Sequence, residues 1–277
     1  MRFGAHVRRG AEATRGVVMV CPDGGADCAQ IFVSNPRAWA GPTIRDDQAA
    51  AFREAWRASG LGPLAAHAPY LVNIASPNPA FLERSRQLAS ATVLACERMG
   101  VDLLVVHSGA GGTEGDRGGA RIRAAETLRR TAGDADDVGV LVELMAGTAG
   151  AVASSIPEAA ALLEAAGDPR IGLCLDTCHL FAAGYGLDTP EGVDELFTEL
   201  AAHGLTDRVG LVHANDSMFP RGERRDRHEN IGDGHIGIEG WRAIVDRPEA
   251  ADWSFVLETP GDAERHAADI ARLRALA

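Results

Sequence analysis

Five apolar runs in this chain each end on a residue that binds metals well, and this pattern restricts the possible folds more than any other feature. The runs are LLVVH, VGVLVE, IGLCLDTCH, VGLVH and WSFVLE, and they end at His107, Glu143, His179, His213 and Glu258. Continuous runs of Val, Ile and Leu are typical of parallel strands buried on both faces. In a parallel barrel such strands end at one rim, where functional residues gather. The pattern therefore predicts a site for several metal ions at that rim.

Short strand-like runs alternate with longer helical stretches along the whole chain. The predicted strands span 2–7, 28–33, 64–67, 101–107, 138–143, 171–176, 209–214 and 254–258. Stretches rich in Ala, Leu, Glu and Arg predict helices at 46–59, 78–99, 119–132, 156–166, 190–203, 238–248 and 262–275. Eight strands with intervening helices predict an α/β fold, the (β/α)8 TIM barrel. Because no break in composition divides the chain, we expect one domain over residues 1–277.

The composition narrows the classes of partner and compartment. The formal net charge is −12, and all 27 basic residues are Arg, which we attribute to the base composition of the source genome. An acidic chain disfavours nonspecific coating of nucleic acid but permits a local basic surface. The five cysteines form no CxxC pair, so we expect thiols in a reducing cytoplasm. No signal-peptide-like start and no run of about 20 apolar residues is present, which predicts a cytoplasmic protein without a membrane partner.

The candidate metal ligands are five His and four carboxylates, nearly all at strand ends. They are His67, His107, Glu143, Asp176, His179, His213, Asp226, His228 and Glu258. Each has an ordinary alternative when taken alone: a lone His after an apolar run is usually structural, and Glu143 could belong to a salt bridge. Together, mixed His and carboxylate ligands suit Zn²⁺, Mn²⁺ or Fe²⁺, and nine ligands could hold three ions with open positions for catalysis.

Several of these residues lie in longer recognisable segments. HAPYL, GLCLDTCHLFAAGYGL, HANDS and DRHENIGDGHIG resemble the signature blocks of the endonuclease IV family, apurinic/apyrimidinic (AP) endonucleases built on a TIM barrel with three zinc ions. The resemblance extends from GAHV at 4–7 to LET at 257–259. It implies three metal sites, formed by His67, His107 and Glu143; by Glu143, Asp176, His213 and Glu258; and by His179, Asp226 and His228.

The resemblance also implies an activity and a substrate. We expect a metal-dependent phosphodiesterase, an AP endonuclease that cleaves damaged double-stranded DNA 5′ to abasic sites in base excision repair. Glu143 and Glu258 are the expected catalytic carboxylates: Glu143 would bridge two Zn²⁺ ions, and Glu258 would orient or deprotonate the attacking water. Mn²⁺ or Fe²⁺ could replace Zn²⁺ in one or more of the three sites. We expect a monomer.

Five residues are candidates for DNA contacts. Arg37, Tyr70 and Leu71 match the family's positions that insert into DNA, where an aromatic and an aliphatic wedge would fill the space of a flipped nucleotide. Arg224 and Arg225 would belong to a positive rim beside the third metal site. The alternatives are rim packing for Tyr70, and a solvated loop whose arginines pair with neighbouring Glu residues.

Two other functions stay open. A sugar isomerase or epimerase on the same scaffold would also use a rim of metal ligands, but this chain has no Lys for proton transfer and its Asp226–His228 pair would have no role. A binding module that has lost turnover is the second alternative. It draws on the altered neighbours of Glu143, since Leu144 and Met145 stand where the family has Asn and Thr. Ser108, which stands in place of the family's Pro, is a further departure that concerns the details of the substrate.

Overall fold

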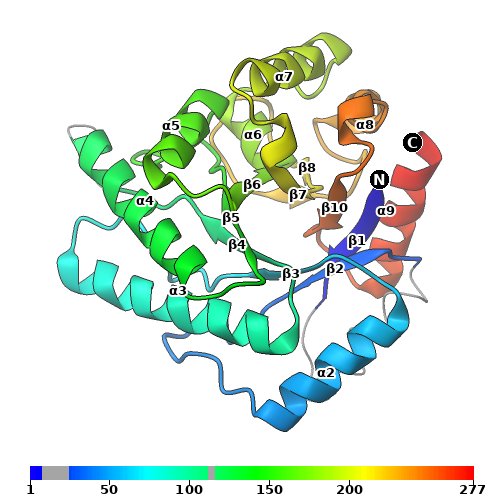
Figure 1. The fold of residues 1–277 in the computed structure, drawn as a ribbon. Helices are drawn as coiled ribbons and strands as arrows, with labels where there is room; N and C mark the ends of the chain where they lie inside the picture. Colours follow the sequence, from blue (N-terminus) through cyan, green and yellow to red (C-terminus); the bar gives the residue numbers. More distant parts are fainter. Residues whose placement is uncertain (8–24, 112–115) are drawn as a thin grey trace.

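Eight parallel strands form a closed barrel in the computed structural model, which describes residues 1–7, 25–111 and 116–277. The order around the barrel is β1-β10-β7-β6-β5-β4-β3-β2. The strands are β1 (Arg2–His6), β2 (Cys28–Ile31), β3 (Leu64–His67), β4 (Leu103–His107), β5 (Gly139–Glu143), β6 (Ile171–Asp176), β7 (Val209–His213) and β10 (Ser254–Leu257). β1 pairs with both β2 and β10, which closes the sheet. The predicted TIM barrel is confirmed, with all eight predicted strands present (Figure 1).

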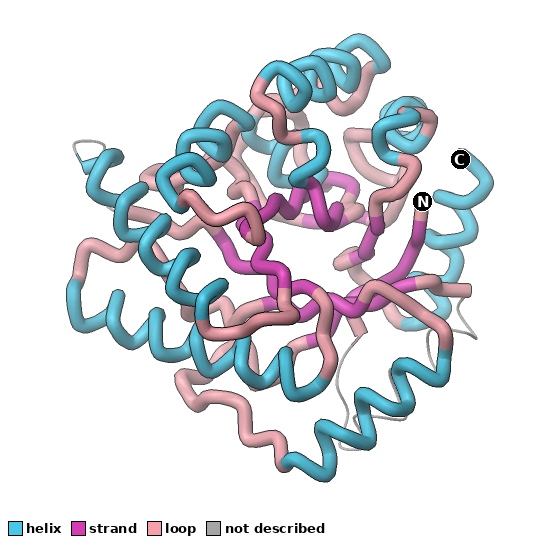
Figure 2. Tube along the Cα trace, viewed as in Figure 1, coloured by secondary structure: helices cyan, strands magenta, loops and turns pink. Residues whose placement is uncertain are grey.

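Helices surround the strands, as the tube view shows (Figure 2). They are α2 (Asp46–Ser59), α3 (Pro79–Met99), α4 (Arg117–Gly133), α5 (Ile156–Ala166), α6 (Thr177–Ala183), α7 (Pro190–Ala202), α8 (Gly237–Val245) and α9 (Ala263–Leu276), with 3₁₀ turns η2 (Thr206–Arg208) and η3 (Pro248–Ala250). Seven of them coincide with the predicted helices. The sequence does not predict α6 as a separate element: it begins directly after β6, and the Asp176 side chain caps it by accepting a hydrogen bond from the His179 amide. No described helix is long and apolar enough to span a membrane.

The inside of the barrel is filled by one small or branched apolar side chain from each of seven strands. These residues are Cys28, Ala65, Val105, Leu141, Cys174, Leu211 and Val256. The eighth strand, β1, contributes Gly4, where a Cβ would overlap the carbonyl oxygen of Cys28. Since alternate strand residues face the same side, the next inward position lies two residues further along each strand. Those positions are polar: His6, Gln30, His67, His107, Glu143, Asp176, His213 and Glu258.

The segment after β7 is folded rather than a plain loop. β8 (Asp216–Ser217) and β9 (His228–Glu229) pair in an antiparallel two-stranded sheet that the sequence does not predict. The chain between them is held to α6, because the amides of Gly222 and Arg224 donate to the carbonyls of Phe181 and Ala182, both at 3.0 Å. This arrangement brings Asp226 and His228 to the end of the barrel where the ligand-bearing strands stop.

Candidate metal centre

The nine predicted ligands converge at one end of the barrel and form three overlapping clusters. The first cluster is His67, His107 and Glu143. Glu143 Oε2 lies 3.1 Å from His67 Nε2 and 3.3 Å from His107 Nε2. Glu143 is buried, and both histidines come from the neighbouring strands β3 and β4, so the register of the sheet alone brings these atoms together.

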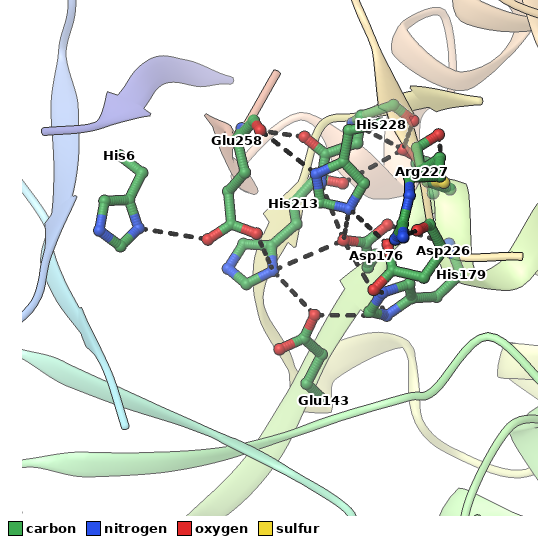
Figure 3. A network of polar contacts seen from close by, with 12 residues as sticks. His6, Glu143, Asp176, His179, His213, Asp226, Arg227, His228 and Glu258 are labelled. Atoms are coloured by element: carbon green, nitrogen blue, oxygen red, sulfur yellow. Dashed lines mark hydrogen bonds and ion pairs between the residues drawn. The ribbon is translucent and has the colours of Figure 1, made fainter. Parts of the chain in front are cut away.

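The second cluster uses the other oxygen of the same carboxylate. Glu143 Oε1 lies 3.1 Å from His213 Nδ1. The same nitrogen is 3.5 Å from Glu258 Oε2 and 3.8 Å from Asp176 Oδ2. Three carboxylates therefore face a single imidazole nitrogen (Figure 3). Glu143 links this cluster to the first through its other oxygen.

The third cluster is His179, Asp226 and His228. Asp226 lies close to both histidines, with Oδ2 at 3.3 Å from His179 Nε2 and Oδ1 at 3.2 Å from His228 Nε2. His228 Nε2 is buried and makes no hydrogen bond with a described residue, although carboxylate oxygens lie close by. An imidazole nitrogen that faces carboxylates without bonding them suits a position where a cation would lie between the ligand atoms.

The pKa shifts of the histidines and carboxylates also indicate that a cation would lie between the ligand atoms. Burial lowers the pKa of His213, but the neighbouring cysteine and carboxylates outweigh burial and hold it well above its ordinary value. The pKa of His228 is likewise raised, to about 9, against the effect of burial, by Asp176 and Asp226. Burial raises the pKa of Glu143, yet the charges of His213 and His107 leave it well below its usual range. Among the described residues these carboxylates have no side-chain ion pair with Arg, and they favour protons on the histidines. A divalent cation would replace those protons.

Backbone carbonyls fix which ring nitrogen of His67 and of His179 faces the centre. His67 Nδ1 contacts the Ala68 carbonyl at 2.6 Å, and His179 Nδ1 contacts the Leu144 carbonyl at 2.9 Å. A carbonyl only accepts, so these Nδ1 atoms carry the hydrogen and the Nε2 atoms face the ligands. The Leu144 side chain is buried in the core. The departure from the family pattern at this position therefore leaves the support of His179 intact, because the backbone provides it.

A second departure, at Ser108, also has a structural partner. The Ser108 hydroxyl donates to the Ala153 carbonyl at 3.1 Å and accepts from the Ala153 amide at 3.2 Å. The hydroxyl thereby ties the residue after His107 to the segment before α5.

Asn215, after β7, supports two of the ligands. Its amide group donates to Asp176 Oδ2 at 2.8 Å, and its side-chain oxygen accepts from the backbone amide of Glu258 at 2.9 Å.

Sequence reasoning did not identify Gln30 as part of the site and left His6 without a role. Both are next to Glu258: Gln30 Nε2 lies 2.7 Å and His6 Nδ1 3.2 Å from Glu258 Oε1. The only available signal was their spacing, two residues after Gly4 and Cys28 on strands whose other inward positions are small.

Cys178 lies near Asp176 and His228, and their side-chain atoms form a further group that could hold a metal ion. Burial raises the pKa of its thiol to about 12, and the thiol donates to the Arg227 carbonyl at 3.6 Å. Cys96 and Cys174 are also buried thiols, and burial raises the pKa of Cys174 to about 12 as well. Cys21 lies outside the described residues.

The five predicted DNA contacts belong to two segments of the chain, and Tyr70 reaches the ring of the ligand His67. Arg37 and Tyr70 line a cavity of about 780 Å³, and the Tyr70 amide donates to the Pro36 carbonyl at 3.0 Å. Tyr70 is 52% exposed, with its ring 5.6 Å from that of His67, and Leu71, the next residue, is half-buried.

The second group belongs to the segment between β8 and β9. Arg224 has a left-handed backbone (φ 57°), and the Arg225 guanidinium lies 3.5 Å from the ring centre of Phe219. Both arginines are exposed, and among the described residues neither takes part in an ion pair, whereas Arg221 approaches Asp188 at 3.4 Å. The alternative in which Arg224 and Arg225 pair with neighbouring Glu residues is therefore not found among the described residues.

Comparison with known proteins gives a consistent result. The pattern of the family described as xylose isomerase-like TIM barrel matches residues 21–276. A protein of Streptomyces coelicolor named "probable endonuclease 4" is 40% identical over 256 residues, covering 91% of this chain and 86% of its own length. A protein of Methanoculleus marisnigri with the same name is 37% identical over 278 residues, covering 99% of this chain and 98% of its own.

Solved structures extend the comparison. The crystal structure of endonuclease IV from Thermus thermophilus superimposes with a TM-score of 0.88 at 32% identity, covering 100% of this chain and 98% of its own. A D-psicose 3-epimerase from Clostridium cellulolyticum superimposes with a TM-score of 0.67 at 16% identity, covering 100% of this chain and 95% of its own. At that identity the epimerase shows a shared fold and nothing more.

Proposed function

The chain belongs to the endonuclease 4 family within the xylose isomerase-like TIM barrels, and we propose that it is a metal-dependent AP endonuclease of base excision repair. Its substrate is damaged double-stranded DNA, and it hydrolyses the phosphodiester bond 5′ to an abasic site. The observation that carries the proposal is the convergence of nine His and carboxylate ligands in three linked clusters at one end of the barrel.

The donor set fits three divalent cations, which we propose to be Zn²⁺, with Mn²⁺ or Fe²⁺ as possible replacements. The holders are His67, His107 and Glu143 for the first ion; Glu143, Asp176, His213 and Glu258 for the second; and His179, Asp226 and His228 for the third. When bound, such ions supply a low-pKa water and neutralise the charge that develops on the phosphate and on the leaving oxygen. The surrounding residues hold the ligands and the attacking water in position.

Glu258 is the residue best placed to act on the attacking water. Burial raises the pKa of Glu258, but the positive charge of His213 and the hydrogen bond with His6 hold it below its usual range, so the carboxylate is ionised. Its Oε1 is held by Gln30 and His6, while Oε2 faces the centre. An ionised carboxylate held in this way can orient a water molecule and accept its proton. Glu143 holds two clusters together through its two oxygens.

Recognition of the lesion is assigned to the residues around the centre. The exposed Tyr70 ring with Leu71 would fill the space left by a nucleotide that leaves the stack. Arg37, Arg224 and Arg225 would contact phosphates, which provides local positive charge on a chain whose net charge is −12.

A duplex with one abasic site tests the proposal directly. The metal-loaded protein should nick the strand 5′ to the lesion, a chelator should abolish nicking, and an undamaged duplex should stay intact. Glu258→Gln should lose nicking, and Glu264→Gln, an exposed change in the first turn of α9, should retain it. Tight binding of the duplex without a nick would favour a binding module instead. Epimerisation of a ketose with no action on DNA would favour the sugar enzyme.

A further inference from the structure

Gln30 is a fully buried amide on β2 that joins two of the metal ligands. Its Nε2 lies 2.7 Å from Glu258 Oε1, and its Oε1 lies 2.9 Å from His213 Nε2. Its backbone is also fixed on both sides, since β2 pairs with β1 at His6 and with β3 at Ala65. The side chain therefore spans from one ligand to the other on a rigid support.

The partners determine the orientation of the amide. A carboxylate that serves as a metal ligand only accepts hydrogen bonds, so the Gln30 group 2.7 Å from Glu258 Oε1 is the NH₂. The opposite orientation would place two oxygens against each other at that distance. The Gln30 oxygen consequently faces His213 and accepts the hydrogen of its Nε2.

This orientation has a consequence for each ligand. Because His213 Nε2 keeps its hydrogen, the nitrogen that is free to bind a metal is Nδ1, which is the atom that faces Glu143, Asp176 and Glu258. For Glu258, the shorter bond, from Gln30, occupies Oε1 together with the longer contact from His6, and Oε2 is left toward the centre. The amide thus selects the ligating atom of His213 and, with His6, that of Glu258.

We propose that Gln30 is a positioning residue for the second metal cluster, setting the ligating nitrogen of His213 and the orientation of Glu258. The inference rests on the proposed metal site and deepens it. Gln30 has no solvent exposure, so it cannot contact DNA. A buried amide is costly unless its hydrogen bonds are made. Here the amide contacts two metal ligands, Glu258 and His213, and its Nε2 also lies 2.9 Å from Nδ1 of His6, which itself contacts Glu258. Partners of this kind orient ligands and raise metal affinity.

Gln30→Met tests the proposal, because Met has nearly the same volume and makes neither hydrogen bond. The matched control is Gln87→Met, the same change on the exposed face of α3. Zn²⁺ affinity, measured by competition with a chromogenic chelator, should fall by about 10- to 100-fold in Gln30→Met and stay unchanged in the control. The visible spectrum of the Co²⁺-loaded protein should change only in Gln30→Met, because it reports coordination geometry.

Kinetics on an abasic duplex provide a second readout. For Gln30→Met, kcat should fall by a similar factor while KM stays within about twofold of the wild-type value, because the substrate never meets this residue. If Gln30→Met does not fold, Gln30→Asn replaces it: the shorter amide cannot reach both partners, and the same fall in Zn²⁺ affinity is expected. Wild-type Zn²⁺ affinity in the variant, or a raised KM with unchanged kcat, overturns the proposal. The metal measurements involve no DNA, so they stand even if the wild-type protein fails to nick.

Discussion

Replacement of Glu143 by Gln is the sharpest perturbation of the centre, because the two carboxylate oxygens belong to different clusters. Oε2 is 3.1 Å from His67 Nε2, and Oε1 is 3.1 Å from His213 Nδ1. The amide of Gln is almost isosteric, but it has one oxygen and no charge. It can therefore ligate on one side only, and it leaves the protonated histidines of the other side without their partner.

The size of the effect follows from the burial of the group. Loss of one partner of a buried charged pair costs about 3–5 kcal/mol, and about 1.4 kcal/mol corresponds to a tenfold change in an equilibrium constant. We therefore expect Glu143→Gln to weaken Zn²⁺ binding in the linked clusters by roughly a hundredfold to a few thousandfold. The third cluster, which does not use this carboxylate, should keep its affinity.

The assay is metal content after dialysis against a graded series of chelator concentrations. Wild type should retain three ions per chain, and Glu143→Gln should lose one or two at a chelator concentration that leaves the wild type loaded. Glu83→Gln on the exposed face of α3 is the matched control and should behave as wild type. If Glu143→Gln retained all its ions through the whole series, the assignment of Glu143 as a bridge would be refuted.

Three further predictions concern the rim, the wedge and pH. Arg224→Ala combined with Arg225→Ala should weaken binding of an abasic duplex. It should also reduce the slope of log K against log salt concentration by roughly one for each phosphate that these arginines neutralise. An unchanged slope in a filter-binding titration would exclude these residues from the interface. Tyr70→Ala should lower affinity for an abasic duplex by about 1–3 kcal/mol, the value of one stacked base, and leave affinity for undamaged duplex unchanged in an anisotropy titration. In the metal-free protein, His228 has a pKa of about 9, against 6.5 in the unfolded chain. Its contribution to the free energy of unfolding is therefore complete below pH 6.5 and is lost as the pH rises towards 9. The urea concentration at the midpoint of unfolding should fall over that interval, and a rising midpoint would contradict the assignment.

The strands and the ligands at their ends were predictable because each has a local signal. LLVVH and VGVLVE are apolar runs with one polar residue at the end. In a parallel barrel the ends of all the strands lie at the same rim, so these polar residues are expected to meet there. Even the short LAAH run of β3 carries the pattern. The support of the ligands was not predictable in this way. Gln30 bonds to residues 183 and 228 positions further along the chain, and one Gln in an apolar run carries no mark of such partners.

Two other features lay beyond sequence reasoning for related reasons. The substitution of Leu144 suggested a weakened centre, but the group that supports His179 is a carbonyl that every residue possesses. The small sheet of β8 and β9 depends on hydrogen bonds with α6, an element of seven residues that begins directly after a metal ligand. The support of His179 and the position of the β8–β9 sheet both depend on backbone hydrogen bonds, and the identities of the side chains do not predict these bonds.

The absence of a side chain at Gly4 makes the floor of the barrel asymmetric. On that side β1 and β2 meet backbone to backbone, and nothing compressible separates them. Any added atom at Gly4 must displace β2 as a unit, and the displacement would be carried two residues up the strand to the amide of Gln30. A methyl group at Gly4, which is not a metal ligand, would then lower the affinity of the second cluster for its metal ion. Activity can therefore be lost through a substitution at a residue that contacts neither metal nor substrate.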